Sequence, residues 1–444
     1  MKKKNKFLII LLGIIVMLFL SFSYFQRGDA GNSGYIEGKS FYTKPKIEKT
    51  VKINITDSCN PIFYKNYMIY VDLIKDNNRD YKTYLNAIDL SNYSIKWRRS
   101  DLEYWNDYYI YEDKLYMTLA KNKEDKGRDT IWCLNPETGE TIWETKIQLK
   151  QYKWLREIAF CKNMVLVSSD DAKIYFLDRD TGKIVRERQF LYKDRKNISE
   201  KWVMGGSTSI MHMSVSGDIV VFLHLAYGYI AYDIAADKVL WIYGYKAQEN
   251  EDLWRVGLVL DNDSAYLSLR EAIRENYAMI GCFEFVCVDL RTGKEKWRIE
   301  KIDKKDYYFN FSLSPVVVDK EKVYIEAEGR IIAYDKLTGK KVWEFSLEKQ
   351  KGIPKSNCEL HIYMTYYLMK IGDVLYYPLD TFYAIDGKTG KLLWWDRFNF
   401  KAFNKESDTM FQYIVGIGVY NDKLYLLSAE NKGENFGYLY VLSY

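Results

Sequence analysis

The sequence has few of the residue types that build catalytic and metal centres. Only three histidines and six cysteines occur among its 444 residues. His212, His224 and His361 lie far apart, without the spacing that brings ligands together around zinc. No two cysteines are adjacent, and the sequence contains no nucleophile elbow, phosphate-binding loop or HExxH motif. The sequence therefore predicts no catalytic residues and no metal ligands.

Charge is nearly balanced over most of the chain. The formal net charge is +5, and Lys2, Lys3, Lys4 and Lys6 supply four of these charges. The remainder is close to neutral and carries no basic stripe of the kind that binds nucleic acid. Nucleic acid is therefore not an expected partner.

Long apolar runs are also scarce, with one exception directly behind those lysines. Residues 7–25 form an uncharged run of nineteen residues, which just reaches the length needed to span a membrane. We predict a signal anchor, or transmembrane helix, over residues 1–25 and a flexible tether over 26–44. The positive end would stay inside, so we expect a single-pass protein of the cell membrane with its remainder outside the cytoplasm. The alternative is a signal peptide cleaved near Ala30, followed by secretion.

What the sequence does contain is a repeated nonapeptide. Its clearest copy, Asp335-Lys-Leu-Thr-Gly-Lys-Lys-Val-Trp343, follows a β-branched and aromatic stretch and begins an alternating one. The carboxylate of Asp335 can cap the backbone of the turn, and Gly339 can supply the positive φ that a short hairpin needs. This segment is therefore predicted to end one strand, turn and begin the next.

Seven copies recur at intervals of about fifty residues, and an eighth is cut off by the end of the chain. In the third copy Asp178 is followed eight residues later by Arg186. The other six place Trp at this distance, in the pairs Asp89 and Trp97, Asn135 and Trp143, Asp233 and Trp241, Asp289 and Trp297, Asp335 and Trp343, Asp386 and Trp394. Such a period, with four strand-like segments per unit, is typical of propeller blades. We predict an all-β protein, with a single eight-bladed β-propeller of four-stranded antiparallel blades over residues 45–444.

The residue two positions before the first residue of each copy is mostly small, as in Ala87, Cys133 and Ala333. We infer a slot into which the recurring Trp packs between blades. In the third copy Phe176 and Arg186 replace the small residue and the Trp. Phe176 is therefore expected to fill volume that the missing indole would occupy. The predicted blade-docking residues are Trp97, Trp143, Trp241, Trp297, Trp343 and Trp394.

The pattern small-x-Asp-x-x-Thr-Gly-x-x-x-Trp resembles the PQQ-like repeats with the tryptophan-docking motif, over roughly residues 45–444. Such repeats occur in quinoprotein dehydrogenases and in the propeller lipoprotein of the outer-membrane barrel-assembly machinery. The resemblance implies the propeller fold, but the same blades serve enzymes and scaffolds alike. The dehydrogenases carry an adjacent pair of cysteines near the quinone, which this sequence lacks. No cofactor is therefore expected, and PQQ is disfavoured.

Two further patterns concern the ends of the chain and the loops. Residues 46–54 alternate like the strand that the last blade lacks, so we expect them to pair with residues 437–444 and close the ring. The hairpin turns are short, whereas links between blades such as 188–209, and loops after second strands such as 271–277, are long. These long connections are expected on one face, around one mouth of the channel.

Four aromatic residues precede innermost strands and would form a collar at that mouth: Trp105, Trp154, Trp254 and Phe411. Such a collar suits stacking on sugar rings or gripping peptide side chains, and the alternative is packing of loops onto the blades. The predicted function is a non-catalytic binding scaffold of the cell envelope, a monomer whose loops bind an envelope protein or a cell-wall polymer. The alternative is an enzyme, either a PQQ-dependent dehydrogenase or a polysaccharide-active propeller.

Overall fold

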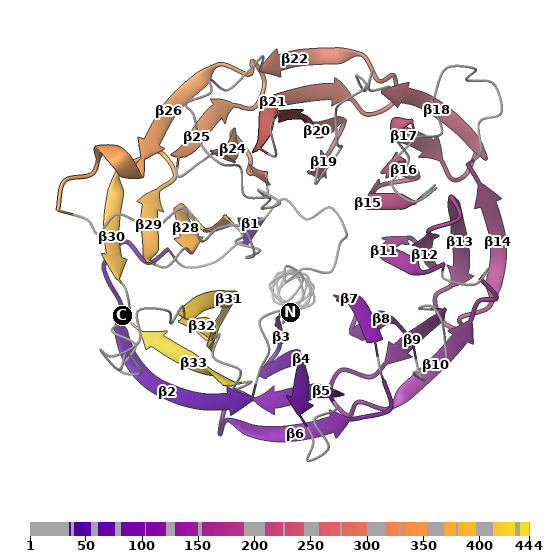
Figure 1. Ribbon diagram of the computed structural model, residues 1–444, viewed down its shortest axis with the longest axis horizontal. Helices are drawn as coiled ribbons and strands as arrows, with labels where there is room; N and C mark the ends of the chain where they lie inside the picture. Colours follow the sequence, from indigo (N-terminus) through magenta and orange to yellow (C-terminus); the bar gives the residue numbers. More distant parts are fainter. Residues whose placement is uncertain are drawn as a thin grey trace, which may run out of the picture.

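The described part of the chain forms a closed ring of eight β-sheets (Figure 1). The computed structural model describes residues 35–36, 40–54, 61–75, 81–102, 104–120, 129–149, 153–190, 209–224, 227–243, 257–275, 278–299, 316–327, 330–352, 368–378, 381–396, 412–430 and 436–443. The predicted anchor over 1–25 and most of the predicted tether over 26–44 lie outside these residues. No helix among the described residues is long and apolar enough to cross a membrane.

Each sheet is one blade, with its first strand innermost and its fourth strand on the outside of the ring (Figure 1). Blades one and two consist of β3 (Ile62–Tyr64), β4 (Tyr67–Lys75), β5 (Tyr81–Asp89) and β6 (Ser94–Arg99), then β7 (Tyr104–Tyr111), β8 (Lys114–Ala120), β9 (Thr130–Leu134) and β10 (Thr141–Lys146). Blades three and four consist of β11 (Leu155–Cys161), β12 (Met164–Ser169), β13 (Lys173–Asp178) and β14 (Ile184–Gln189), then β15 (Ile210–Ser216), β16 (Ile219–His224), β17 (Gly228–Asp233) and β18 (Lys238–Tyr243).

The second half of the ring repeats this arrangement. Blades five and six consist of β19 (Leu258–Asp261), β20 (Ser264–Glu275), β21 (Ala278–Asp289) and β22 (Glu295–Ile299), then β23 (Val317–Val318), β24 (Lys322–Ala327), β25 (Arg330–Asp335) and β26 (Lys341–Ser346). Blades seven and eight consist of β27 (Met369–Ile371), β28 (Val374–Pro378), β29 (Phe382–Asp386) and β30 (Leu392–Asp396), then β31 (Gln412–Tyr420), β32 (Lys423–Glu430), β33 (Phe436–Ser443) and β2 (Lys46–Asn54). The prediction of an all-β, eight-bladed propeller with four-stranded antiparallel blades is confirmed.

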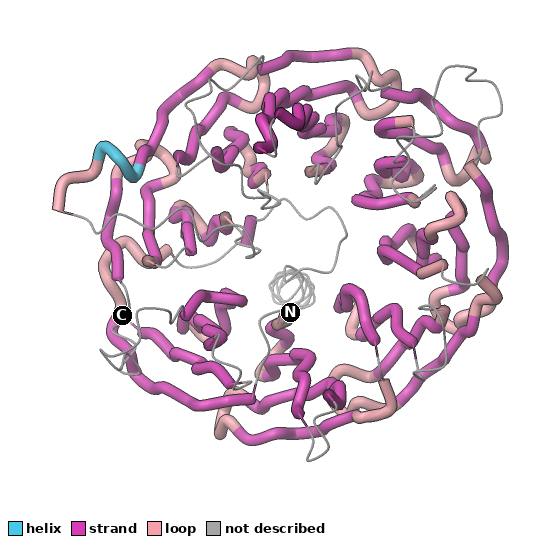
Figure 2. Tube along the Cα trace, in the orientation of Figure 1, coloured by secondary structure: helices cyan, strands magenta, loops and turns pink. Residues whose placement is uncertain are grey.

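Among the described residues, two short elements stand outside this plan. β1 (Tyr35–Ile36) pairs in parallel with β27, so the innermost edge of blade seven carries a fifth strand that the sequence did not predict. A 3₁₀ turn, η3 (Leu347–Lys349), follows β26 and is the cyan segment in Figure 2. The innermost edge of any blade has unpaired backbone groups facing the channel, which explains why two further residues can add there.

The ring closes through the N-terminal segment, as predicted. β2 pairs antiparallel with β33 from Lys46 opposite Ser443 to Asn54 opposite Phe436. The residues just before β2 are also part of the propeller: Phe41 is fully buried, and its N–H bonds the hydroxyl of Tyr376 at 3.2 Å. The propeller therefore begins at or before Ser40, which shortens the segment predicted as a tether.

The two faces of the ring are built differently. In an antiparallel four-stranded blade, the turns between strands one and two and between strands three and four lie at the same end. Backbone bonds tie these two turns together, for example from Leu90 N to Asn66 O (2.7 Å) and from Lys336 N to Glu321 O (2.9 Å). We call this end the short-turn face and the opposite end the loop face.

The six recurring tryptophans reach across to the next blade at the short-turn face. In each of them the indole N–H donates to a backbone carbonyl of the following blade, and in five the acceptor is the residue directly after the capping Asp or Asn. For the last, Phe41 supplies the carbonyl. The bonds run from Trp97 to Pro136 (2.9 Å), Trp143 to Arg179 (2.8 Å), Trp241 to Leu290 (2.8 Å), Trp297 to Lys336 (3.0 Å), Trp343 to Gly387 (3.2 Å) and Trp394 to Phe41 (2.8 Å).

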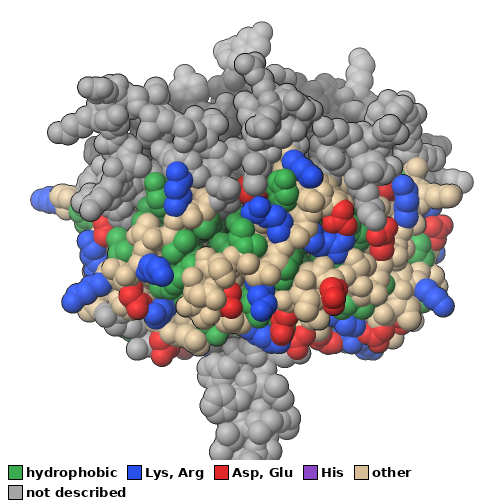
Figure 3. Space-filling model, turned by 90° about the horizontal axis from the view of Figure 1, so that it is seen from below, with side chains coloured by type: hydrophobic (Ala, Val, Ile, Leu, Met, Phe, Trp, Pro, Cys, Tyr) green, Lys and Arg blue, Asp and Glu red, His purple; other side chains and the backbone are tan. Residues whose placement is uncertain are grey.

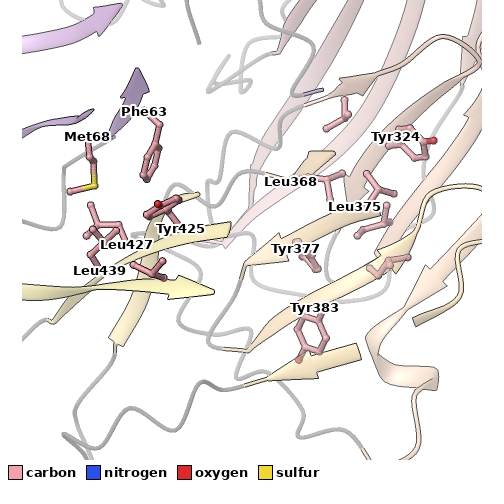
Figure 4. Close-up of a cluster of buried hydrophobic side chains, with 14 of the residues drawn as sticks. Phe63, Met68, Tyr324, Leu368, Leu375, Tyr377, Tyr383, Tyr425, Leu427 and Leu439 are labelled. Atoms are coloured by element: carbon pink, nitrogen blue, oxygen red, sulfur yellow. The ribbon is translucent and has the colours of Figure 1, made fainter. Parts of the chain in front are cut away.

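The apolar core lies between blades and not in one central mass. Figure 4 shows Phe63 and Met68 of blade one beside Tyr425 and Leu427 of blade eight. The rings of Phe63 and Tyr425 lie 5.6 Å apart, and a Cβ at Gly418 would meet Phe63 at 2.1 Å, so this boundary needs glycine. The outer wall, in contrast, intersperses Lys and Arg with Asp and Glu around smaller apolar areas (Figure 3).

Candidate functional site

The collar residues do not meet within the described part of the chain. Trp254 and Phe411 lie outside it, and of Trp105 only the backbone is described, in β7 opposite Leu119. Trp154 precedes β11 at the loop-face mouth of the channel and is 38% exposed. The collar therefore stays a prediction, and Trp154 is its one member whose side chain can be placed.

Trp154 is held in place by a buried carboxylate. Asp170, in the turn between β12 and β13, accepts a hydrogen bond from the backbone N–H of Trp154 at 3.2 Å and returns one from its own N–H to Trp154 O at 3.0 Å. The same carboxylate binds Arg156 through two bonds of 2.5 and 3.1 Å, and Ser209 donates to it at 2.6 Å. The Arg156 guanidinium lies 5.1 Å from the centre of the indole. Asp170 thus fixes both the backbone and the supporting cation of an exposed aromatic ring.

Sequence reasoning missed Asp170 and its partners. The available signal is the run Ser168-Ser169-Asp170, three polar residues ending a strand that is otherwise apolar. All three are buried in the folded chain. Buried polar groups at the end of a strand need partners, and those of Asp170 come from Trp154 and Arg156 at the entry to β11 and from Ser209.

The innermost strands carry bulges close to this mouth. Register shifts occur between Trp105 and Tyr108 in β7, between Leu155 and Ile158 in β11, and between Met211 and Ser214 in β15. Each bulge turns residues out of the ladder near the loop face, which is common beside binding sites. The bulges therefore shape the mouth of the channel beside Trp154.

A side chain at the bulge of β11 contacts the bulge of β15 in the next blade. Glu157 accepts the backbone N–H of Met213 at 2.9 Å, and its second oxygen lies 3.9 Å from Nδ1 of His212. His212 has a positive φ of 49°, an unusual conformation for a residue with a side chain. Glu157 and His212 therefore connect blades three and four at the channel. The second histidine of blade four, His224, is buried in β16, and burial lowers its pKa to about 4.

The described residues offer binding groups and no reactive constellation. Among them, no group of three or more His, Cys, Asp or Glu could hold a metal ion. Cys133 and Cys287 are buried and free, and burial raises the pKa of their thiols to about 12 and about 11. These thiols stay protonated at neutral pH, so they are poor nucleophiles. What the site can do with the groups described is stack a planar ring or sugar on Trp154.

Several solved structures share the fold over most of the chain. BamB from Moraxella catarrhalis aligns with 11% identity and a TM-score of 0.52, covering 90% of this chain and 100% of that one. Quinohemoprotein alcohol dehydrogenase from Comamonas testosteroni aligns with 12% identity and a TM-score of 0.59, covering 94% and 80%. The computationally designed Ika8 protein aligns with 13% identity and a TM-score of 0.57, covering 89% and 100%. At such identities these likenesses show the fold alone.

Sequence similarity identifies the propeller family to which the chain belongs. No match was found among curated proteins. A family model does match, over residues 109–345 and 283–397, which together span more than half of the chain. The chain therefore belongs to the PQQ-like propeller family whose model is described as outer membrane protein assembly factor BamB.

Proposed function

We propose that this protein is a non-catalytic binding scaffold of the cell envelope whose loop face holds an envelope protein or a cell-wall polymer. The observation that carries the proposal is Trp154, an exposed indole fixed at the channel mouth by Asp170 and Arg156. A rigid aromatic group loses little entropy on binding, which is why Trp often dominates the affinity of an interface.

The contrast between the two faces supports using the loop face for binding. On the short-turn face, many polar groups are engaged in holding blades together. Ion pairs there join Lys65 to Glu137 at 2.6 Å and Lys114 to Asp180 at 2.7 Å, in addition to the indole bonds. The loop face receives the long connections, which can vary without disturbing the ring.

The envelope location rests on the sequence and on the family. The apolar run over 7–25 behind four lysines supports a single-pass membrane protein with the propeller outside the cytoplasm, and secretion after cleavage is the alternative. The family description names an outer membrane protein assembly factor, which supports a place in the envelope and a protein as partner. We further propose that the protein acts as a monomer.

We also propose that the protein takes no quinone cofactor, because its sequence lacks the adjacent pair of cysteines that quinoprotein dehydrogenases carry near the quinone. The rival function is a PQQ-dependent dehydrogenase or a polysaccharide-active enzyme. Absorbance spectra after adding PQQ and calcium, followed by a dye-linked alcohol assay, test the first rival, and we expect neither a bound-quinone spectrum nor turnover.

The proposal is tested by comparing two exposed apolar side chains on opposite faces. Full-length protein carrying Trp154→Ala should retain envelope proteins or sedimented wall polymer at least about tenfold less well than the wild type. Leu337→Ala is the matched control, because Leu337 is 85% exposed in a turn of the short-turn face. Both variants should melt like the wild type. Equal retention by all three proteins would contradict binding through Trp154.

A further inference from the structure

Positive charge is concentrated on the outermost strands of two neighbouring blades, β2 of blade eight and β6 of blade one. These two strands carry six Lys and Arg against one Glu, a net charge of +5. The other six outermost strands together carry seven against five, a net charge of +2. The sequence did not reveal this concentration, because β2 and β6 are far apart in the chain and become neighbours only when the ring closes (Figure 1). Figure 3 looks onto the outer wall from the side on which Figure 1 places these strands.

Two lysines of β2 are directed toward blade one. The bulge between Ile47 and Lys49 places Lys46 opposite Ser443 and Lys49 opposite Val441. Ser443 and Val441 are two residues apart in β33, so the two lysines share one face of blade eight. Val441 belongs to the apolar cluster shared with blade one, which identifies that face as the one toward blade one.

Two cations of blade one are directed toward blade eight in the same way. Arg98 of β6 lies opposite Asn86 of β5, and Lys82 is four residues before Asn86 in the same strand. Their face is that of Ile88, which belongs to the same apolar cluster. All four side chains are exposed at the outer rim of the boundary between blades eight and one, and we call them the cationic seam: Lys46, Lys49, Lys82 and Arg98.

Neutral groups hold two of these cations in position. The ammonium nitrogen of Lys49 lies 4.2 Å from the ring centre of Tyr93. Nε of Arg98 donates to the buried amide oxygen of Asn86 at 2.6 Å, and its guanidinium carbon lies 5.0 Å from the ring centre of Tyr84. An aromatic ring or an amide orients a cation without cancelling its formal charge. The positive charges are therefore fixed in place and still uncompensated.

Elsewhere on the outer wall, cations are paired with carboxylates. Such pairs join Lys146 to Asp129 (3.3 Å), Lys173 to Glu187 (3.3 Å), Arg298 to Glu295 (2.6 Å) and Lys341 to Glu344 (3.0 Å). Within the part of the chain that the structure describes, no ion pair joins a cation of the seam to a carboxylate. Of the acidic residues nearby, Glu48 pairs with Lys423 at 2.7 Å and Asp72 is buried. The seam therefore keeps an excess of positive charge.

We propose that the cationic seam binds a phosphate-bearing wall polymer, a chain of sugars or polyols linked by phosphodiesters. The inference rests on the proposed function, because it takes the envelope location from it and names the chemistry of one wall partner. Lys and Arg bind phosphate through charge-assisted hydrogen bonds, and a polyanion gains further from the release of its counterions. The ring is round in Figure 1, so a flat bilayer could touch its convex outer wall only along a narrow line. A flexible chain can follow the boundary and reach cations on both blades.

The experiment sediments full-length protein with protease-treated cell walls of the native host. One sample of walls is intact, and a second has lost its phosphodiester polymers to hydrofluoric acid. We expect binding to intact walls that weakens with added salt, and little binding to the stripped walls. Lys46→Gln combined with Lys82→Gln should weaken binding to intact walls about tenfold or more, since two phosphate contacts are lost.

A matched control removes two paired cations of the outer wall, in Lys146→Gln combined with Lys341→Gln. Their side chains are 56% and 55% exposed, and the net charge changes by the same amount as in the seam variant. We expect the control to bind intact walls nearly as well as the wild type. An equal loss in both variants would overturn the proposal, because the charge of the whole surface would then be responsible.

Three other outcomes also overturn it. Wild-type affinity in the seam variant would remove the seam as a site, and equal binding to stripped walls would remove phosphate as the group recognised. Binding to phosphatidylglycerol vesicles without binding to walls would assign the seam to a lipid surface. Trp154 lies outside the seam, so a loss of envelope binding in Trp154→Ala alone would support the loop-face scaffold even where the seam variant binds like the wild type.

Discussion

Seven of the eight boundaries between blades fall into two classes, and comparing these classes shows how the ring is held; at the eighth, between blades seven and eight, Trp394 bonds the carbonyl of Phe41. At five boundaries an indole lies over a glycine of the next blade, at Gly139, Gly182, Gly293, Gly339 and Gly390. All five glycines have positive φ, and a Cβ built on them would lie 2.5 to 2.7 Å from the indole. At the boundary between blades three and four, Arg186 replaces the indole and Asp237 replaces the glycine. Where blade eight meets blade one, Lys49 lies opposite Val441 and takes the position of the indole. Tyr93 takes the turn position of the glycine and also has a positive φ.

Where a cation replaces Trp, the turn of the next blade therefore has a residue with a side chain in place of glycine. Arg186 donates to Ile234 O from both terminal nitrogens at 3.1 Å, so it takes over the acceptor that an indole would use. It also lies 3.8 Å from the Asp237 carboxylate. Lys49 sits 4.2 Å above the ring of Tyr93. An indole requires glycine beneath it because of its size, whereas a cation leaves room for a partner and gains from having one.

The largest expected effect comes from removing the chain that completes the last boundaries. Deleting residues 40–54 removes Phe41, which accepts the Trp394 indole, and all of β2, which includes Lys49. The open edge of β33 should then aggregate or the domain should melt many degrees lower. Calorimetry of the soluble domain with and without the segment measures this. Unchanged melting would show that closure through β2 is dispensable.

The next largest effect compares the stability that an indole gives to a boundary with the stability that Arg186 gives. Trp297→Ala or Trp343→Ala should cost about 3–5 kcal/mol in unfolding free energy, because each leaves a cavity and an unbonded carbonyl. Arg186→Ala should cost less, since Arg186 is partly exposed and its ion pair is screened by water. Urea denaturation of the three variants checks the order. A loss for Arg186→Ala as large as that for Trp297→Ala would mean that the two classes of boundary are equally strong.

The sequence predicted much of this ring because its signals are local. Asp335, Thr338 and Gly339 form a turn within five residues, where Asp335 accepts the N–H and hydroxyl of Thr338. The pairing of small residues with Trp, such as Ala333 opposite Trp343, is also a short-range pattern. What it could not reveal is which residues of the next blade each Trp contacts. That Gly339 lies under Trp297, or that Phe41 completes the bond of Trp394, depends on residues brought together only by closure of the ring.

The candidate site was less predictable for the same reason. Trp154 was found by its spacing from the next strand, but Asp170 and Ser209 reach it from other strands. The length of β20 and β21 escaped notice because the four charged residues within 270–275 are typical of a loop. Long-range partners and strand extension both depend on tertiary context, which overrides local propensity.

An intermediate effect tests whether Trp and glycine act as a pair. Phe176 lies opposite Arg186, with the guanidinium carbon 4.1 Å from its ring, so the two positions touch as the volume hypothesis requires. Phe176→Ala alone should cost about 3–5 kcal/mol. Adding Arg186→Trp should recover part of this loss, and adding Asp237→Gly as well should recover about 1–3 kcal/mol more, because the indole then meets no Cβ.

Denaturant titrations of the single, double and triple variants decide this prediction. The triple variant restores the small residue, the indole and the glycine that the other boundaries share. If the effects of Phe176→Ala and Arg186→Trp simply add, Phe176 does not compensate for the missing indole. If Asp237→Gly gives the same change with Arg186 as with Trp at position 186, the coupling between indole and glycine is absent.

The smallest expected effect is a difference in acid and salt sensitivity. A hydrogen bond from the Tyr232 hydroxyl, and after it Arg188 and Arg186, hold the pKa of Asp237 below its ordinary value. A carboxylate with a lowered folded pKa contributes stability above its unfolded pKa and loses it as the pH falls through the folded value. The boundary between blades three and four should therefore weaken below about pH 4, and salt should weaken it at pH 6.

In Asp237→Asn the melting temperature should fall less between pH 6 and pH 3 than in the wild type, whereas Trp297→Ala should lower it by a similar amount throughout. The turn caps, such as Asp335 with its pKa lowered by Thr338, titrate in the same range in both variants and cancel in the comparison. Parallel curves for Asp237→Asn and the wild type would show that the charged boundary is no more sensitive to acid than those docked by tryptophan.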